Sequence, residues 1–138
     1  DSAIHENYKL VTTIKGIGLV NAANTIVYTN NFTSFQTARQ YACYCGIAPF
    51  EHKSGTSIKG RTMVSSLGCH QLKAELSMAA RSAIINDPWL HKYYKRKMAE
   101  KGDVSGAHGV VLNAIKFKLV ARMFSVIKSG TPYKVMTY

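Results

Sequence analysis

The most constraining feature of this chain is an apolar repeat near its end. Within residues 105–128, apolar side chains recur at every fourth position: Val111, Ile115, Leu119, Met123 and Ile127. Because an α-helix turns once in about 3.6 residues, this spacing places all of them near one face. The pattern predicts a long final helix, with Lys116, Arg122 and Lys128 on its other faces.

Shorter periodic segments predict five further helices, so the fold is expected to be mainly α. We expect helices at residues 1–13, 19–28, 34–44, 68 or 69–85 and 89–100, with Ser34 as the N-cap of the third. Gly46 is expected to end the third helix and Pro88 to lie in the first turn of the fifth. The side chains expected to point inward in the first, second and fourth helices are Ile4, Tyr8, Val11, Ala22, Ala23, Ile26, Leu72, Leu76, Ala79, Ala80 and Ile84.

The domain organisation is expected to be simple, because no repeat, low-complexity tract or linker interrupts the chain. We predict a single domain over residues 1–138. It would contain a helix-hairpin-helix at about residues 5–30, a basic loop at about 46–62 and a helical remainder at 66–130. Part of the loop, around residues 50–62, has the alternation that also suits a short β-hairpin.

The charge of the chain indicates its class of partner. With 18 Lys and Arg against 7 Asp and Glu, the formal net charge is +11, which predicts attraction to a polyanion such as DNA. A membrane partner is not expected, because no apolar run approaches the ~20 residues that span a bilayer. No signal peptide opens the chain, so we expect a cytoplasmic location.

Metal-binding patterns are weak in this sequence. Cys43 and Cys45 lie two apart in an expected helix and so do not share a face, which argues against a zinc site with Cys69 and His70. Buried reduced thiols are the better interpretation. The carboxylates are scattered, so no cluster suited to two-metal strand chemistry is visible. We expect no metal site and no cofactor in this chain.

The segment Ile-Lys-Gly-Ile-Gly at residues 14–18 has the pattern of a helix-hairpin-helix. Its glycines, Gly16 and Gly18, allow a tight turn and leave backbone N–H groups open at the start of the next helix. The helix dipole favours a phosphate at that position, and Lys15 adds a positive charge. The alternative is a plain turn between helices, with glycines that serve packing.

A second candidate is the loop at residues 46–61, GIAPFEHKSGTSIKGR. It places Ser54 before Gly55, with positive charges at Lys53, Lys59 and Arg61, an arrangement that suits contact with a phosphate. His52 is close enough in sequence to be considered as a base for Ser54, although a surface histidine is the simpler interpretation. By itself Ser-Gly is also a common turn pair.

A third candidate is the run of positive charges around two tyrosines at residues 92–97. Lys92, Lys95, Arg96 and Lys97 surround Tyr93 and Tyr94, as in surfaces that track phosphates and stack bases. The alternative is a solvated helix face whose tyrosines anchor it to the core.

The order of these motifs resembles a known family. The matching positions are Leu10, 14–18, Ala22, Phe35, Ala38, 41–42, 46–49, 54–55, 72–73, Leu76, 79–80, 93–94 and 132–133. Together they are similar to the C-terminal transposase domain of the Piv-type DNA invertases and related insertion-sequence transposases, the bridge-RNA-guided recombinases. The likeness covers almost the whole chain. Lys15 stands where the family often has proline, and Lys73 where it usually has arginine.

The resemblance implies a function. Ser54 corresponds to the family's serine nucleophile for DNA strand cleavage and rejoining. Lys73, at the position where the family usually has arginine, is expected to contact nucleic acid. The family's magnesium ligands lie in an N-terminal RNase H-like domain that this chain lacks, so the chain alone is expected to be inactive. The expected partners are DNA, a structured guide RNA and further copies of the full-length protein, in the bacterial cytoplasm. A non-catalytic nucleic-acid-binding module and an assembly domain remain the alternatives.

Overall fold

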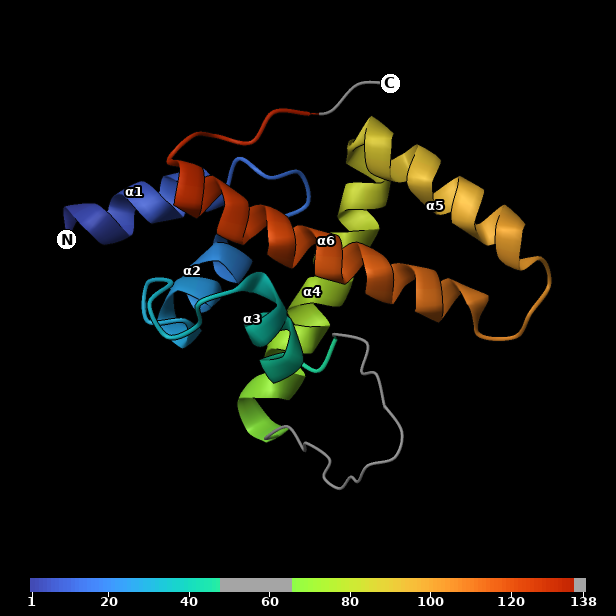
Figure 1. Ribbon diagram of the computed structural model, residues 1–138, viewed down its shortest axis with the longest axis horizontal. Coiled ribbons are helices and arrows are strands. Elements are labelled where there is room, and N and C mark those ends of the chain that lie inside the picture. Colours follow the sequence, from blue (N-terminus) through green and yellow to red (C-terminus); the bar gives the residue numbers. More distant parts are fainter. Residues whose placement is uncertain (48–65, 136–138) are drawn as a thin grey trace.

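The computed structural model describes residues 1–47 and 66–135, with the backbone alone for residues 66–69. These residues form six helices and no strand (Figure 1): α1 Ser2–Val11, α2 Leu19–Tyr28, α3 Ala38–Tyr44, α4 Ser66–Asn86, α5 Pro88–Lys101 and α6 Ala107–Ser129. The prediction of a mainly α fold is confirmed. The loop or β-hairpin expected at residues 50–62 lies outside the described residues. None of the six helices is long and apolar enough to cross a bilayer.

The centre of the fold is α6, which packs against α1, α3, α4 and α5 and crosses α4 (Figure 1). Its repeat of apolar side chains faces the core as predicted, because Val111, Ile115, Leu119 and Met123 are buried. Ile127 is half-buried against the same core. The opposing side chains of α4 also match the predicted pattern, with Leu72, Leu76, Ala79 and Ala80 buried and Ile84 half-buried.

Two positive charges of α6 lie in unexpected surroundings. Lys116 and Arg122 were expected on faces away from the apolar stripe, but only 7% and 8% of their surfaces are exposed. The expectation of a polar outer face is wrong for them because α6 is covered on several sides by other helices. Lys128, near the end of α6, is exposed as expected.

The third helix begins later than the sequence pattern predicts. Thr37, and not Ser34, is its N-cap, and the Thr37 hydroxyl accepts a hydrogen bond from the Gln40 N–H. Ser34 instead closes the turn after α2, where its N–H donates to the Thr29 carbonyl at 2.9 Å. This turn contains Asn31 in the left-handed region, with φ of 58°, so the chain leaves α2 through an irregular segment.

Two inward assignments in the first two helices are also wrong. Ile4, near the start of α1, is 43% exposed. The buried residue of this helix is Val11, at its other end. Ala23 is exposed, whereas its neighbour Ala22 and Ile26 are buried as predicted. The buried face of α2 is therefore narrower than the sequence pattern predicted, because it does not include Ala23.

A fully buried carboxylate joins three parts of the fold. Asp87 caps α5, and its Oδ1 accepts hydrogen bonds from the N–H groups of Trp89 and Leu90 at 2.9 and 3.2 Å. Its Oδ2 accepts from the Arg122 guanidinium of α6 at 2.9 Å and from the Tyr133 hydroxyl at 3.0 Å. The ring of Tyr133 also lies 4.7 Å from the Arg122 guanidinium carbon.

The segment after α6 continues this network to the turn between the first two helices. The backbone N–H of Tyr133 donates to the Thr13 hydroxyl at 2.9 Å, 120 residues earlier in the chain. Residues that follow α6 therefore hold the turn after α1, the start of α5 and the middle of α6 in one arrangement.

This network makes a prediction about stability. Arg122→Met leaves the buried Asp87 carboxylate without its cation, so we expect the free energy of unfolding to fall by about 3–5 kcal/mol. Tyr133→Phe removes one hydrogen bond to the same carboxylate but leaves its cation in place, so it is expected to cost less, about 1.5–3 kcal/mol. Urea denaturation of both variants provides the measurement. Equal losses for the two would show that the ion pair is not the stronger constraint.

Candidate nucleic-acid interface

The structure describes four of the residues expected to contact nucleic acid: Lys15, Gly16, Gly18 and Lys73. The other predicted site residues, Ser54 with Lys53, Gly55, Lys59 and Arg61, lie outside the described residues, as does His52. The roles of Ser54 and its neighbours therefore stay predictions.

Gly16 is required by packing. Its backbone has φ of +98°, and a Cβ placed there would lie 2.5 Å from the Ala79 carbonyl oxygen and 2.8 Å from the Ala83 Cβ of α4. No other residue type allows the turn to approach α4 so closely. The packing alternative raised for the hairpin glycines therefore describes Gly16 well.

Gly18 lies in different surroundings. It is the N-cap of α2, with φ of −92°, and no side chain caps the helix. A Cβ placed on Gly18 would meet no atom within 4 Å. The next two residues, Leu19 and Val20, are 65% and 68% exposed, and Lys15 is exposed nearby in the turn. The positive end of the α2 dipole is therefore accessible from solvent, as phosphate contact requires. The helix-hairpin-helix assignment itself stays a prediction.

Positive charges gather where α4 meets α6. Lys73 and Arg81 lie eight residues apart on α4, which is about 12 Å along the helix axis. Both lower the pKa of Lys116 of α6, so Lys116 is within electrostatic reach of each. The ion pairs of the described residues join Arg96 and Lys97 to Glu100, and Arg122 to Asp87. Within that part of the chain, no carboxylate pairs with a member of this group, which we call the α4–α6 cation cluster (Lys73, Arg81 and Lys116).

Lys116 is the unusual member of this cluster. It is 7% exposed, and in the described ranges it makes no hydrogen bond, ion pair or ring contact. Burial lowers the pKa of the Lys116 ammonium below its usual value, and the charges of Lys73 and Arg81 lower it further. Because the unfolded chain binds this proton more tightly, charged Lys116 costs stability at neutral pH. That stability returns as the pH rises through the lowered pKa.

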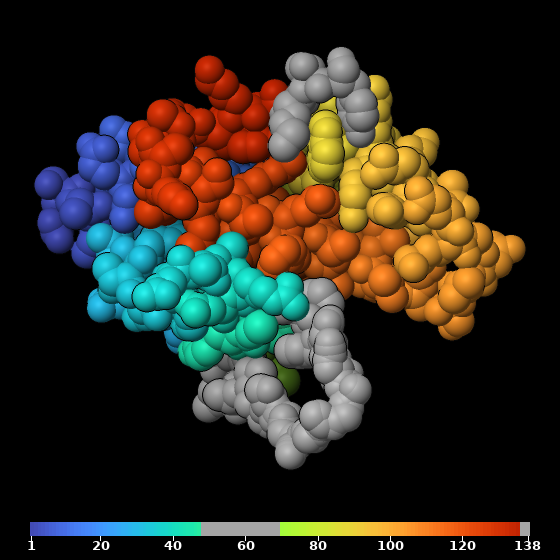
Figure 2. Space-filling view, viewed as in Figure 1, coloured from blue at the N-terminus to red at the C-terminus, as the bar shows by residue number. Residues whose placement is uncertain are grey.

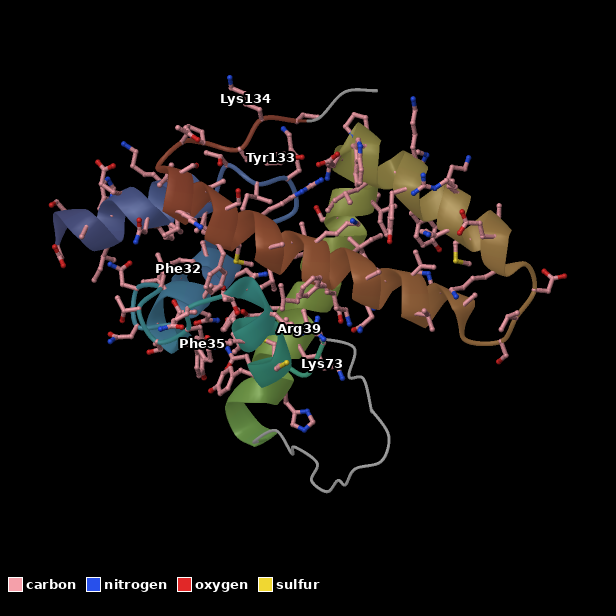
Figure 3. All side chains as sticks on the ribbon, in the orientation of Figure 1. Phe32, Phe35, Arg39, Lys73, Tyr133 and Lys134 are labelled. Atoms are coloured by element: carbon pink, nitrogen blue, oxygen red, sulfur yellow. The ribbon has the colours of Figure 1, made fainter. Side chains whose placement is uncertain are left out.

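The cation cluster lies close to the place where the described chain stops before residue 48. The side-chain amide of Asn113 on α6 donates to the Ile47 carbonyl at 2.7 Å and so holds the end of this segment. Gly46, the residue before Ile47, lines the same surface groove as Lys73. Figure 3 shows Arg39 of α3 and Lys73 of α4 on this side of α6, with Tyr133 on the other side in the view.

The tyrosines of α5 are used for packing. Tyr93 stacks on Trp89 with ring centroids 5.7 Å apart, and the Lys118 ammonium lies 4.7 Å from the Tyr93 ring centre. The Tyr94 hydroxyl is 2.7 Å from the Nδ1 of His108 on α6. The positive charges of this helix are thus combined with rings that anchor it, which favours the second of the two interpretations for the tyrosines.

The residues predicted from the sequence to contact nucleic acid did not include three of these positive charges: Arg81, Lys116 and Lys118. The eight-residue spacing of Lys73 and Arg81 puts them about 80° apart around α4, which is only a weak signal for neighbouring positions. Lys116 and Lys118 gave no comparable signal, because the side chains that α6 presents to α4 and α5 depend on packing. No three His, Cys, Asp or Glu side chains of the described residues converge on a possible metal position.

Comparison with known proteins identifies the family. Residues 8–95 match the model of the Transposase IS116/IS110/IS902 family, so the chain belongs to this family of transposases. The chain is 31% identical over 130 residues to the insertion element IS110 uncharacterized 43.6 kDa protein of Streptomyces coelicolor, covering 94% of this chain and 31% of that protein.

Two further relatives are pilin gene-inverting proteins. The protein from Moraxella lacunata is 32% identical over 130 residues, with 92% of this chain covered. The protein from Moraxella bovis is 30% identical over 131 residues, with 94% covered. The matches span 39% of each of these relatives, so the chain corresponds to about two fifths of their length. The predicted resemblance to Piv-type invertases and insertion-sequence transposases is confirmed.

The two glycines of the turn give opposite predictions. Gly16→Ala is expected to lower the free energy of unfolding by more than about 1 kcal/mol, because its φ is positive and its Cβ meets α4. Gly18→Ala is expected to cost less than about 1 kcal/mol, since its φ is negative and its side is open. Thermal unfolding of the two variants measures this difference. Equal destabilisation would contradict the close approach at Gly16.

Proposed function

We propose that this chain is the part of a DNA transposase or site-specific recombinase that binds DNA and supplies Ser54 as the nucleophile for strand cleavage and rejoining. Family membership supports the general role, since the relatives include insertion-element and gene-inverting proteins. In this proposal the chain is the C-terminal part of the transposase, with its active form completed by an N-terminal RNase H-like domain.

The single observation that carries the DNA-binding part is the α4–α6 cation cluster. Lys73 and Arg81 of α4 both act on Lys116 of α6, no carboxylate pairs with any of the three in the described ranges, and partial desolvation of Lys116 lowers its pKa further. Repulsion between these charges lowers the free energy of unfolding, and a bound anion would relieve it. A DNA phosphate supplies that charge, and the formal net charge of +11 favours its approach.

The chemistry at Ser54 follows the usual course of phosphoryl transfer. The serine oxygen attacks the phosphorus of a strand, a P–O bond to the departing sugar hydroxyl breaks, and a serine–phosphate ester forms. The serine proton passes to a base, and the departing oxygen takes up a proton. Attack by a new sugar hydroxyl reverses the exchange and reseals a strand. Positive charges beside the phosphorus stabilise the transition state.

Magnesium belongs, in this proposal, to the N-terminal domain. The described residues bring no three acidic, histidine or cysteine side chains together, so we assign no metal ligand among them and derive no step through a metal. A structured guide RNA and a homo-oligomer of the full-length transposase are the further partners that we propose on the basis of the family. The turn at Gly18 supplies a second phosphate contact in the same scheme.

The cation cluster makes a prediction about salt dependence. Lys73→Gln and Arg81→Gln each remove one phosphate contact, so each is expected to reduce the slope of log binding constant against log salt by about 1 for duplex DNA. Lys116→Met is expected to weaken DNA binding while raising the melting temperature, because it removes a partly desolvated charge that Lys73 and Arg81 repel. Fluorescence anisotropy at several salt concentrations measures binding.

Lys9→Gln is the matched control, since Lys9 is exposed on α1 and belongs to neither proposed contact. It removes the same charge and is expected to leave the slope almost unchanged. Binding whose salt dependence falls equally for all four variants would mean that net charge, and not the cluster, attracts DNA.

The nucleophile is tested in the full-length transposase. Ser54→Ala is expected to abolish a covalent protein–DNA adduct that survives denaturing electrophoresis, because no other atom replaces the serine oxygen. Ser57→Ala, three residues away in the same segment, is the control and should retain the adduct.

An adduct that persists in Ser54→Ala would overturn the assignment of Ser54. If the full-length transposase binds and recombines DNA without ever forming an adduct, the non-catalytic module is the better description of this chain. The cation cluster would then contribute affinity alone.

A further inference from the structure

A groove runs over the N-terminal half of α6. Its volume is about 730 Å³, and it lies between Tyr93 of α5 on one side and Gly46 and Lys73 on the other. In the space-filling view, the surface of α6 is visible between α3 and α5 (Figure 2). The groove begins beside Gly46, the residue before the Ile47 carbonyl that Asn113 holds.

Part of the groove lining, formed by α6, is apolar. Gly109 and Ala114 present almost no side chain, and Phe117 adds an aromatic ring that is half-buried against the core. A Cβ placed on Gly109 would meet no atom within 4 Å, so there is room above the helix at this position. A planar ring can therefore approach α6 closely and lie against Phe117.

The two edges of the groove carry positive charge. Lys73 lies at one edge and Lys118 at the other, and among the described residues that line the groove none is acidic. The Lys118 ammonium lies 4.7 Å from the Tyr93 ring centre and 5.3 Å from that of Trp89, which orients the charge without neutralising it. Arg122, Lys97 and Arg96 add positive potential around Lys118.

We propose that this groove binds a single-stranded stretch of nucleic acid, with phosphates at Lys73 and Lys118 and a base against Phe117. The proposal rests on the proposed function, because it assigns a further nucleic-acid contact that shares Lys73 with the cation cluster. A positive groove with an aromatic surface is the arrangement that proteins use for single strands. In a duplex the base faces are stacked inside, so a duplex has no ring to offer to the apolar lining.

Charge complementarity favours this occupant over a protein segment. The groove has cations at both edges and, within the part of the chain that the structure describes, no lining carboxylate. Together with the net charge of +11 this suits a polyanion. A second copy of this chain has the same excess of positive charge and would place like charges against these edges. An apolar protein partner would use the apolar lining but leave both lysines without counter-charge.

The test compares a variant that fills the groove with one that changes the same helix elsewhere. Gly109→Leu places a side chain in the open space without changing charge, and it replaces a helix-weakening glycine, so the variant is expected to fold. Ser125→Leu, at an exposed position farther along α6, is the control. Dye-labelled oligothymidine is the single-stranded probe and a mixed-sequence duplex is the second probe, with circular dichroism as the check of folding.

We expect Gly109→Leu to weaken binding of the oligothymidine by about tenfold, the effect of losing one stacked base, and to leave duplex binding unchanged. Ser125→Leu should change neither. Lys118→Gln should weaken single-strand binding and Lys128→Gln should not, since Lys128 is exposed at the far end of the same helix.

Other outcomes separate the two proposals. If the unaltered chain binds both probes and Gly109→Leu binds oligothymidine as tightly, the groove assignment is overturned and the cation cluster remains. If the unaltered chain binds neither probe, the proposed DNA-binding function fails and the groove assignment with it. If Gly109→Leu changes only the self-association of the chain, measured by light scattering, the groove holds a protein and not a strand.

Discussion

The arrangement of this domain depends on one buried ion pair. Asp87 and Arg122 lie in the interior, and the carboxylate is satisfied by two backbone N–H groups, the guanidinium and the Tyr133 hydroxyl. An unpaired carboxylate at this position would be costly, so the partners must all be present together. Through Tyr133 and Thr13 the same network reaches the turn after α1. The relative placement of α6, α5 and the glycine turn therefore follows from the requirement to satisfy a single charge.

Much of the fold could be predicted from periodicity, and the failures have a common cause. The repeat in α6 placed Val111, Ile115 and Leu119 correctly, since one apolar face must be buried whatever its neighbours are. Periodicity does not reveal how many helices surround that face, so the burial of Lys116 and Arg122 could not be foreseen. Likewise, serine is on average the better N-cap, yet Thr37 and not Ser34 caps α3, because Ser34 belongs to the irregular turn after α2.

The candidate site was predictable only in its outline. The sequence located the glycine turn, but only the proximity of Ala79 shows that Gly16 serves packing while Gly18 faces open space. Lys73 was expected to contact nucleic acid, whereas the buried Lys116 beside it depends on the crossing of two helices distant in sequence. The role of Ser54 stays a prediction, because its segment lies outside the described residues and a serine beside a glycine has no periodic signature.

The contact of Gly16 with α4 couples two proposed phosphate positions mechanically. The open end of α2 is attached, through Gly16, to Ala79, and Lys73 lies six residues earlier on the same rigid helix. That separation is about 9 Å along the helix axis. The packing therefore fixes the distance between the two proposed phosphate contacts. A nucleic acid that binds at both must bend to match this distance, so sequences that deform easily would bind at a lower cost in deformation energy.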